Sequence, residues 1–308
     1  MRMTKIPEQR MTLSMLAEKF LMVKEAQHCG EKTLHDYRVQ VRKFVEQSRN
    51  LVEYDALEQD VLRYFAAIPD TSPARYNKPF QNVNAFLNWL VEQEYLVKNP
   101  MTANKMRKRR DDGNVKPVEL NDLRLFTDVI DKTTYCGLRD FTIVMVMLDT
   151  GIRTSEILGL QNEDFSPYDN SVVIGKTLAK TRTRRVVYLS ASTARYVEEF
   201  MRCKPKEWEN WLFPNYEGRQ LKVQHLDKAF IKYSRLSGVK ITPYQLRHSF
   251  ATLFVKNGGD LFSLQRMMGH ADLRMTKRYA EIDEDFVRSQ HAEFSPARSL
   301  MQGRKRKL

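Results

Sequence analysis

Between residues 100 and 117 the hydrophobic pattern of the chain is interrupted, and this interruption indicates that the chain folds as two domains rather than one. Residues 105–113 are basic and carry no apolar period, and a proline stands at each end of the break. A chain of 308 residues is long enough for two hydrophobic cores. We therefore expect a domain over residues 11–99, a basic linker over residues 100–117, a larger domain over residues 118–292 and a basic tail over residues 293–308.

The region before the break is expected to form a small helical bundle, because its apolar residues recur at helical spacing. One helix begins at Ser72, a capping residue that is followed by a proline suited to the first turn. Pro79 is expected to kink or restart this helix. The polar face of the same helix carries Asn88 and, nearer its apolar boundary, Asn84, and it suits DNA and ordinary solvent equally well.

The region after the break combines helices with a small sheet. Residues 141–148 are apolar on nearly every side, so this helix is expected at the centre of the second core. Residues 171–175 and 185–189 are rich in β-branched side chains, which predicts an antiparallel hairpin with a basic tip. The predicted fold class is therefore mainly α with a small antiparallel β-sheet, divided into an N-terminal helical bundle and an α+β domain.

Lys and Arg outnumber Asp and Glu by 51 to 38, which gives a formal net charge of +13. An excess of this size attracts polyanions, so nucleic acid is the leading partner. The positive charge gathers in the tail at residues 304–307 and in the linker, at Lys105, Arg107, Lys108, Arg109 and Arg110. These linker residues suit contacts with a phosphate backbone, although a solvated linker has the same composition.

Several classes of protein and site are disfavoured. No apolar stretch reaches the roughly 18 residues that span a bilayer, and the first residues lack the apolar core of a signal peptide. We therefore expect a cytoplasmic, DNA-associated protein with no membrane partner. Cys29, Cys136 and Cys203 form no paired motif, which predicts buried free thiols. The sequence has neither an Asp/Glu/His cluster with metal-ligand spacing nor a Gly-rich phosphate loop, so we expect no metal and no cofactor.

Three segments carry candidates for phosphate chemistry, and the first covers residues 149–160. Gly151 ends the apolar helix, and Arg153 stands at the start of the next one, where a helix N-terminus favours an anion. Arg153 is thus a candidate phosphate clamp, although a lone arginine in a loop is common. Glu156 lies one turn later. It has two interpretations: it orients Arg153 or His270 through a hydrogen bond, or it is a plain surface glutamate.

The second segment covers residues 242–255 and begins a helix with Thr-Pro. Tyr244, Arg247 and His248 fall on one face of this helix, at positions i, i+3 and i+4. The helix therefore presents a second arginine with two hydrogen-bonding side chains. His248 alone fits a buried histidine packed beside the site better than it fits a catalyst.

The third segment covers residues 268–279. Gly269 closes one helix and Asp272 can cap the next, which leaves His270 in the junction. Tyr279 follows two turns further along. Taken alone, each of these residues also fits an ordinary core or surface position.

Together the three segments resemble the signature of the tyrosine recombinases, also called the phage integrase family. In that family Arg, Lys, His-x-x-Arg, His or Trp, and Tyr surround one DNA phosphate. The stretches T-G-x-R-x-x-E, L-R-H-[ST]-F-A-T, and G-H followed nine residues later by Tyr match in order and spacing. The resemblance covers essentially the whole chain, because the family also has a helical, SAM-like core-binding domain, a linker and a mixed catalytic domain.

The resemblance implies a role for each matching residue. Arg153 and Arg247 match the two phosphate-binding arginines, His270 matches the second histidine position, and Tyr279 matches the nucleophile. This chain departs from the family pattern at one position, where Tyr244 replaces the usual first histidine. A phenol can donate a hydrogen bond to a phosphate oxygen, but near neutrality it accepts a proton poorly.

The family's catalytic lysine lies on the hairpin, where this chain offers Lys176 and Lys180. Counting back from the second strand favours Lys180 as the general acid and leaves Lys176 as a DNA contact. The resemblance does not decide between them.

The resemblance implies a recombinase that cleaves and rejoins duplex DNA at a specific site through a 3′-phosphotyrosyl ester, without metal or ATP. It also implies a homo-oligomer, with four protomers in the synaptic complex, and leaves open whether accessory DNA-bending proteins take part. Two alternatives are a DNA-binding member of the family that has lost strand exchange and a related topoisomerase.

Overall fold

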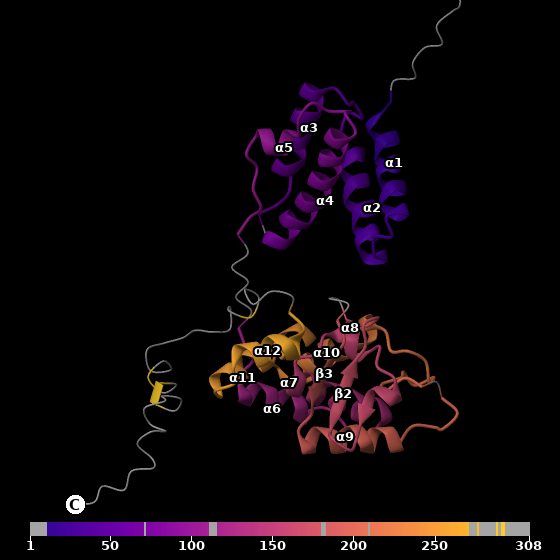
Figure 1. Cartoon of the computed structure of the whole chain (residues 1–308), viewed down its shortest axis with the longest axis vertical. Coiled ribbons are helices and arrows are strands. Elements are labelled where there is room, and N and C mark those ends of the chain that lie inside the picture. Colours follow the sequence, from indigo (N-terminus) through magenta and orange to yellow (C-terminus); the bar gives the residue numbers. More distant parts are fainter. Residues whose placement is uncertain are drawn as a thin grey trace, which may run out of the picture. The chain divides into compact units, whose positions relative to one another are not determined.

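The computed structural model describes residues 11–70, 72–110, 116–179, 183–208 and 210–270, together with residues 276, 288, 291 and 292. The chain divides into two compact units, Met1–Gly113 and Asn114–Leu308. Helices dominate both units, and the second also holds a small antiparallel sheet (Figure 1). The predicted fold class is confirmed.

The first unit is a helical bundle with an aromatic core. Its helices are α1 (Leu13–Ala26), α2 (Glu31–Glu46), α3 (Tyr54–Ala66), α4 (Pro73–Glu92) and α5 (Pro100–Ala103). The ring of Phe20 lies 5.4 Å from that of Phe86 and 5.7 Å from that of Trp89, so α1 and α4 share the centre of this core. Such tilted ring pairs stabilise the packing beyond the apolar area that they bury.

Helix α4 starts where the sequence predicts but does not restart at Pro79. The Ser72 hydroxyl caps it by accepting a hydrogen bond from the Arg75 N–H, and a proline occupies the first turn. Pro79 removes one backbone hydrogen bond. The buried residues Phe80 and Val83 follow directly, and their packing against the core offsets that loss.

The start of the expected linker belongs to the first unit. Residues 100–103 form the single turn α5, capped by the side chain of Asn99. Met101 is 1% exposed and packs in the aromatic core, which explains why the turn is ordered there. A single methionine between a proline and a threonine gives no periodic signal, so hydrophobic patterning alone misses this turn.

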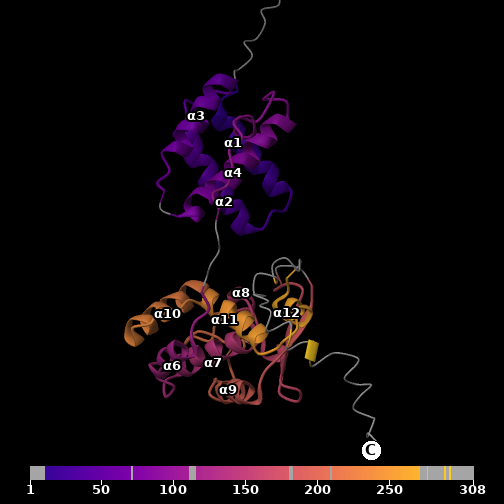
Figure 2. The ribbon, with the colours of Figure 1, turned by 90° about the vertical axis from the view of Figure 1, so that its left-hand side faces the viewer.

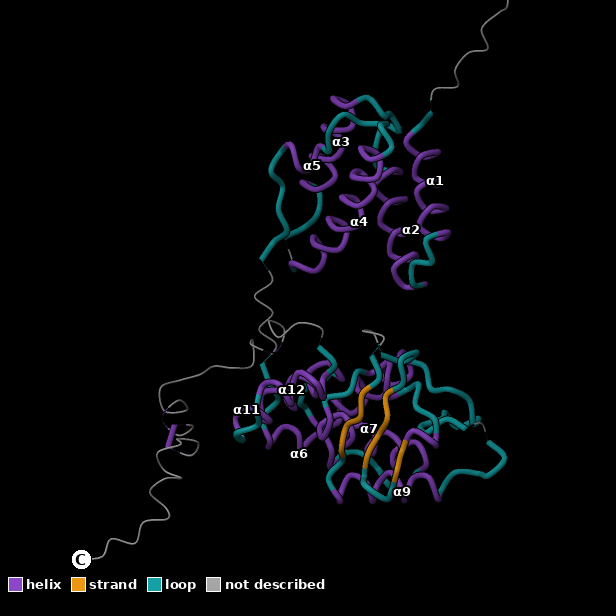
Figure 3. The backbone as a smooth tube through the Cα atoms, viewed as in Figure 1, coloured by secondary structure: helices purple, strands orange, loops and turns teal. Residues whose placement is uncertain are grey.

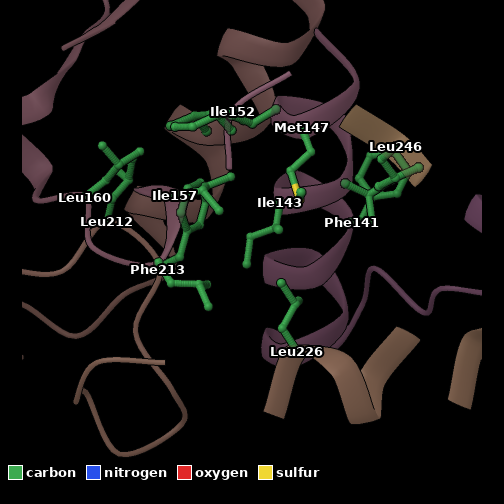
Figure 4. Packing of buried hydrophobic residues seen from close by; sticks show 14 of the residues in the cluster. Phe141, Ile143, Met147, Ile152, Ile157, Leu160, Leu212, Phe213, Leu226 and Leu246 are labelled. Carbon is green, nitrogen blue, oxygen red and sulfur yellow. The ribbon is translucent and has the colours of Figure 1, made fainter. Parts of the chain in front are cut away.

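The second unit is built around α7 (Tyr135–Thr150). Most of this helix is buried, and Phe141, Ile143 and Met147 lie within the core cluster (Figure 4). Helices α9 and α11 pack on α7, and α6 packs on α10 (Figure 2). The surrounding helices are α6 (Leu120–Asp128), α8 (Thr154–Ile157), α9 (Ala191–Arg202), α10 (Val223–Ser237), α11 (Pro243–Lys256) and α12 (Leu261–Met268), with a 3-10 turn at Asn162–Asp164.

The sheet has three antiparallel strands in the order β1-β2-β3 (Figure 3). They are β1 (Phe165–Ser166), β2 (Ser171–Ile174) and β3 (Arg185–Tyr188). Val172 pairs with Val187, so the predicted hairpin is present. Strand β1 was not predicted, because two residues are too few to show an alternating pattern.

Two further expectations concern exposure. In the described part of the chain, no helix is long and apolar enough to cross a membrane. The three cysteines are free thiols, but Cys203 is exposed and Cys29 and Cys136 are half-buried. The expectation of buried thiols is therefore wrong, since Cys203 stands at the exposed end of α9.

Candidate active site

Arg153 lies at the start of α8, directly after the turn that ends α7. Gly151 makes this turn with φ of 61°, and a Cβ there would lie 2.3 Å from the Phe250 ring. The position therefore requires glycine. The turn places Arg153 next to Gly269, whose carbonyl accepts a hydrogen bond from Arg153 Nη2 at 3.0 Å.

Glu156 holds Arg153 in place. Its carboxylate accepts from Arg153 Nη1 and from the Arg153 backbone N–H, both at 3.0 Å. Glu156 is 0% exposed, which removes the interpretation of a plain surface glutamate. Burial alone would raise the pKa of this carboxyl, but hydrogen bonds and charge from Arg185 and Arg153 outweigh burial and hold the pKa below its usual value.

Arg185 is a site residue that sequence reasoning missed. It begins β3, and its Nη1 and Nη2 donate to the Glu156 carboxylate at 3.1 and 2.6 Å. Its Nε donates to the carbonyl of Met267 at 2.8 Å. One signal could have revealed it: strand alternation places Arg185 on the same buried face as Val187, and a buried arginine needs an acidic partner.

Arg247 and His270 form the second half of the cluster. Arg247 is buried on α11 and donates to the carbonyls of Gly151 and Met268, the latter at 2.8 Å. Its Nη2 also lies 3.0 Å from His270 Nε2. Arginine can only donate, so Nε2 accepts, and the proton of a neutral imidazole sits on Nδ1. There it faces Thr276 Oγ1 at 2.9 Å.

The three arginines converge on one helix end. Arg185 binds the carbonyl of Met267, Arg247 that of Met268, and Arg153 that of Gly269. The last carbonyls of a helix have no partner within the helix and carry partial negative charge, so they are natural acceptors for guanidinium groups. The end of α12 thus gathers side chains from α8, β3 and α11 into one cationic cluster.

Tyr244 and His248 lie beside this cluster on α11. Their rings meet at 4.6 Å between centroids, with an interplanar angle of 69°. Tyr244 is 54% exposed at the start of the helix, whereas His248 and Arg247 are buried. The sequence places all three on one face, and the structure separates the exposed phenol from the buried pair along that face.

Other predicted residues are exposed or fall outside the described residues. Lys176 is exposed just after β2. Lys180, Asp272, Tyr279 and the tail at 293–308 lie outside the described residues. Tyr279 as the nucleophile therefore stays a prediction from the motif spacing, and Lys180 as the general acid stays a prediction from its distance to the second strand of the hairpin.

Among the linker residues, Arg109 differs from expectation. Its Nη1 lies 2.7 Å from Asp70 Oδ1, and its guanidinium stacks over the Tyr76 ring at 4.3 Å. Asn77 binds both the N–H and the carbonyl of Arg109, each at 2.9 Å. The charge of Arg109 is thus compensated within the first unit. The other predicted linker contacts are exposed: Lys105, Arg107, Lys108 and Arg110.

Comparison with known proteins identifies the family. The Phage integrase family model matches residues 118–285, which is more than half of the chain. The chain belongs to the phage integrase family, as the motif resemblance predicted.

Relatives and solved structures agree with this assignment. Tyrosine recombinase XerD of Listeria innocua is 26% identical over 291 residues, covering 90% of this chain and 96% of that protein. Tyrosine recombinase XerC of Chlamydia pneumoniae is 24% identical and covers 78% of both chains. The Tn1549 transposon integrase in complex with a circular intermediate DNA has a TM-score of 0.74 at 18% identity, covering 92% of this chain and 99% of that one. A lambda integrase dimer bound to a core site has a TM-score of 0.72 at 15% identity, with coverages of 86% and 97%. These two structures share the fold.

Proposed function

We propose that this chain is a site-specific DNA recombinase, which cleaves and rejoins duplex DNA through a transient 3′-phosphotyrosyl ester. The observation that carries the proposal is the convergence of Arg153, Arg247 and His270 at the end of α12. Tyrosine recombinases that match nearly the whole chain support the same activity.

The arginines suit a reacting phosphodiester. A phosphodiester resists attack because its negative charge repels nucleophiles, and the five-coordinate state carries more charge still. Planar guanidinium groups bind two phosphate oxygens at once and stabilise that charge. Arg153 keeps 19% of its side chain exposed, so it can receive a phosphate oxygen while Glu156 fixes its orientation.

The chemical steps are assigned to residues that match the family motif. Tyr279 gives up its phenol proton and attacks the phosphorus, the bond from phosphorus to the 5′ oxygen breaks, and Lys180 protonates that leaving oxygen; the new ester keeps the energy of the broken bond. Rejoining therefore needs neither ATP nor a metal. Tyr244 would contact the phosphate by a hydrogen bond, acting as a donor rather than as a general base, and His270, at the family's second histidine position, would hold Arg247 in place through Nε2.

Glu156 and Arg185 are proposed as positioning residues. Arg185 neutralises much of the Glu156 charge, so Arg153 retains its net positive charge for the phosphate. Because Arg185 is the first residue of β3, it also fixes one end of the hairpin that carries Lys180.

The proposed partner is duplex DNA carrying a specific recombination site. Exposed cations, Lys105, Arg107, Lys108, Arg110 and Lys176, would bind its phosphates, with a smaller contribution from the compensated Arg109. We assign core binding to residues 11–99, strand cleavage to residues 118–292, and the connection to residues 100–117. Exchange between two sites would use a homotetramer, with or without accessory DNA-bending proteins.

The test begins by selecting a binding site from a pool of random duplexes. A nicked version of that site is incubated with the full chain in excess EDTA and without ATP. We expect a protein–DNA adduct that survives a denaturing gel and vanishes in Tyr279→Phe. Normal binding with no adduct would instead identify a DNA-binding family member, and plasmid relaxation without the selected site would identify a topoisomerase.

A further inference from the structure

A buried asparagine in the first unit has a fixed amide orientation. Asn99 is 6% exposed and stands at the N-cap of α5. Its Oδ1 accepts the backbone N–H of Met101 at 2.9 Å. A backbone N–H can only donate, so the side-chain atom facing it must be the oxygen, and the other atom must be Nδ2.

The Nδ2 of Asn99 then fixes two more amides. It donates to Asn84 Oδ1 at 2.9 Å and to Asn88 Oδ1 at 2.6 Å. Asn84 and Asn88 are four residues apart on α4 and therefore lie on one face of the helix. Since each Oδ1 faces Asn99, the Nδ2 groups of Asn84 and Asn88 are left as donors for a ligand.

Asn88 and Asn99 border a hollow of about 420 Å³. It is lined by Asn88, Val91, Glu92, Lys98, Asn99, Thr102 and Ala103. Lys98 is exposed and adds a cationic donor, with its Nζ held 4.7 Å from the centre of the Tyr54 ring. Glu92 is the acidic member of the lining. Asn88 and Lys98 thus offer N–H groups at the rim, which suits a ligand rich in acceptors.

We propose that the N–H groups of Asn84, Asn88 and Lys98 form a contact site for duplex DNA, with Asn99 as the residue that positions both asparagines. The site rests on the proposed recombinase function. Its ligands are acceptor groups of DNA: phosphate oxygens, or the O6 and N7 of guanine, the base that presents two acceptors together in the major groove. The usual pairing of asparagine with adenine is excluded, because it needs the amide oxygen and nitrogen together, and both oxygens are engaged with Asn99.

The first experiment removes one donor at a time. Binding of the full chain to a fluorescent duplex carrying the selected site is compared for wild type, Asn84→Ala, Asn88→Ala and the control Gln59→Ala. Gln59 is exposed on another helix of the same unit, α3. We expect about tenfold weaker binding for each asparagine variant, since hydrogen bonds to charged or desolvated acceptors are lost, and no change for the control.

The second experiment reverses the orientation of the Asn84 and Asn88 amides without removing either side chain. Asn99→Asp keeps the shape and the cap of α5 but has no N–H to offer, so Asn84 and Asn88 would turn their own N–H groups inward. Gln93→Glu, at the exposed C-cap of α4, adds the same charge and serves as the control. We expect Asn99→Asp to weaken binding at least as much as Asn88→Ala, with Gln93→Glu close to wild type. Circular dichroism and a thermal melt verify that each variant is folded.

Selection of duplexes from a random pool separates the two acceptor sources. If phosphates are the ligands, Asn88→Ala loses affinity evenly across sequences; if guanine is the ligand, it loses a guanine preference at one position. Wild-type affinity in both alanine variants, or loss of an adenine preference, would overturn the proposal. The wild-type adduct at Tyr279 is scored in parallel, and its absence would overturn the recombinase function instead.

Discussion

Two arginine–carboxylate pairs, one from each unit, differ in burial. On α1 and α2 of the first unit, Arg42 pairs with Glu18 at 2.9 Å, and both side chains are more than half exposed. In the second unit, Arg185 and Glu156 pair at 2.6 Å with 4% and 0% of their side chains exposed. Water and salt screen the first pair, whereas the second must remain satisfied by its partners. Burial therefore decides which pair fixes structure.

The largest effect is expected when the shared carboxylate is removed. Glu156→Ala leaves Arg185 buried without its acidic partner, and breaking a buried pair in this way costs about 3–5 kcal/mol. Urea unfolding of the full chain measures the loss. Glu18→Ala is the matched control from the exposed pair and should cost no more than about 1 kcal/mol. Equal losses in the two variants would remove the distinction between the pairs.

A smaller, pH-dependent effect is expected when Arg185 is replaced. The folded state holds the pKa of Glu156 below its usual value, so its stabilising contribution is complete above the unfolded pKa of about 4.3 and is lost as the pH falls through the folded pKa. In Arg185→Met, burial opposes Arg153 alone and the pKa rises. Acid unfolding of this variant should therefore begin at a higher pH than in wild type, as followed by circular dichroism. An unchanged acid midpoint would contradict the shared-carboxylate account.

The smallest effect is expected on the exposed side of the comparison. Arg42→Ala removes a solvent-screened pair and should lower the free energy of unfolding by less than about 1 kcal/mol. Raising the salt concentration should erase even this difference between variant and wild type. A salt-independent loss of several kcal/mol would show that the first unit also depends on its surface pairs.

Local features of the fold could be predicted from the sequence. The cap at Ser72, the left-handed Gly151 and the β-branched hairpin strands each act through neighbouring residues, so a short window contains the whole signal. The same holds for the motif arginines Arg153 and Arg247, whose spacing within their segments is informative.

Features that depend on distant partners could not be predicted. Strand alternation can mark Arg185 as buried, but it does not identify the partners, because Glu156 lies 29 residues earlier and the end of α12 lies 82 residues later. The sequence predicts that Arg109 contacts phosphate, whereas in the structure Asp70 and the Tyr76 ring compensate its charge. The orientation of the Asn84 amide depends on Asn99 across a turn. Such contacts are set by tertiary packing, which no local pattern encodes.

The central claim is that Arg153 and Arg247 neutralise the charge of the reacting phosphate. The most direct measurement compares adduct formation by wild type and Arg247→Ala on two duplexes, one natural and one with a neutral methylphosphonate at the cleaved position. On the natural duplex the variant should be slower by about 10² or more, as when a charge-stabilising donor is removed. On the neutral duplex the account predicts that most of this defect disappears, and an equal defect on both duplexes would contradict it.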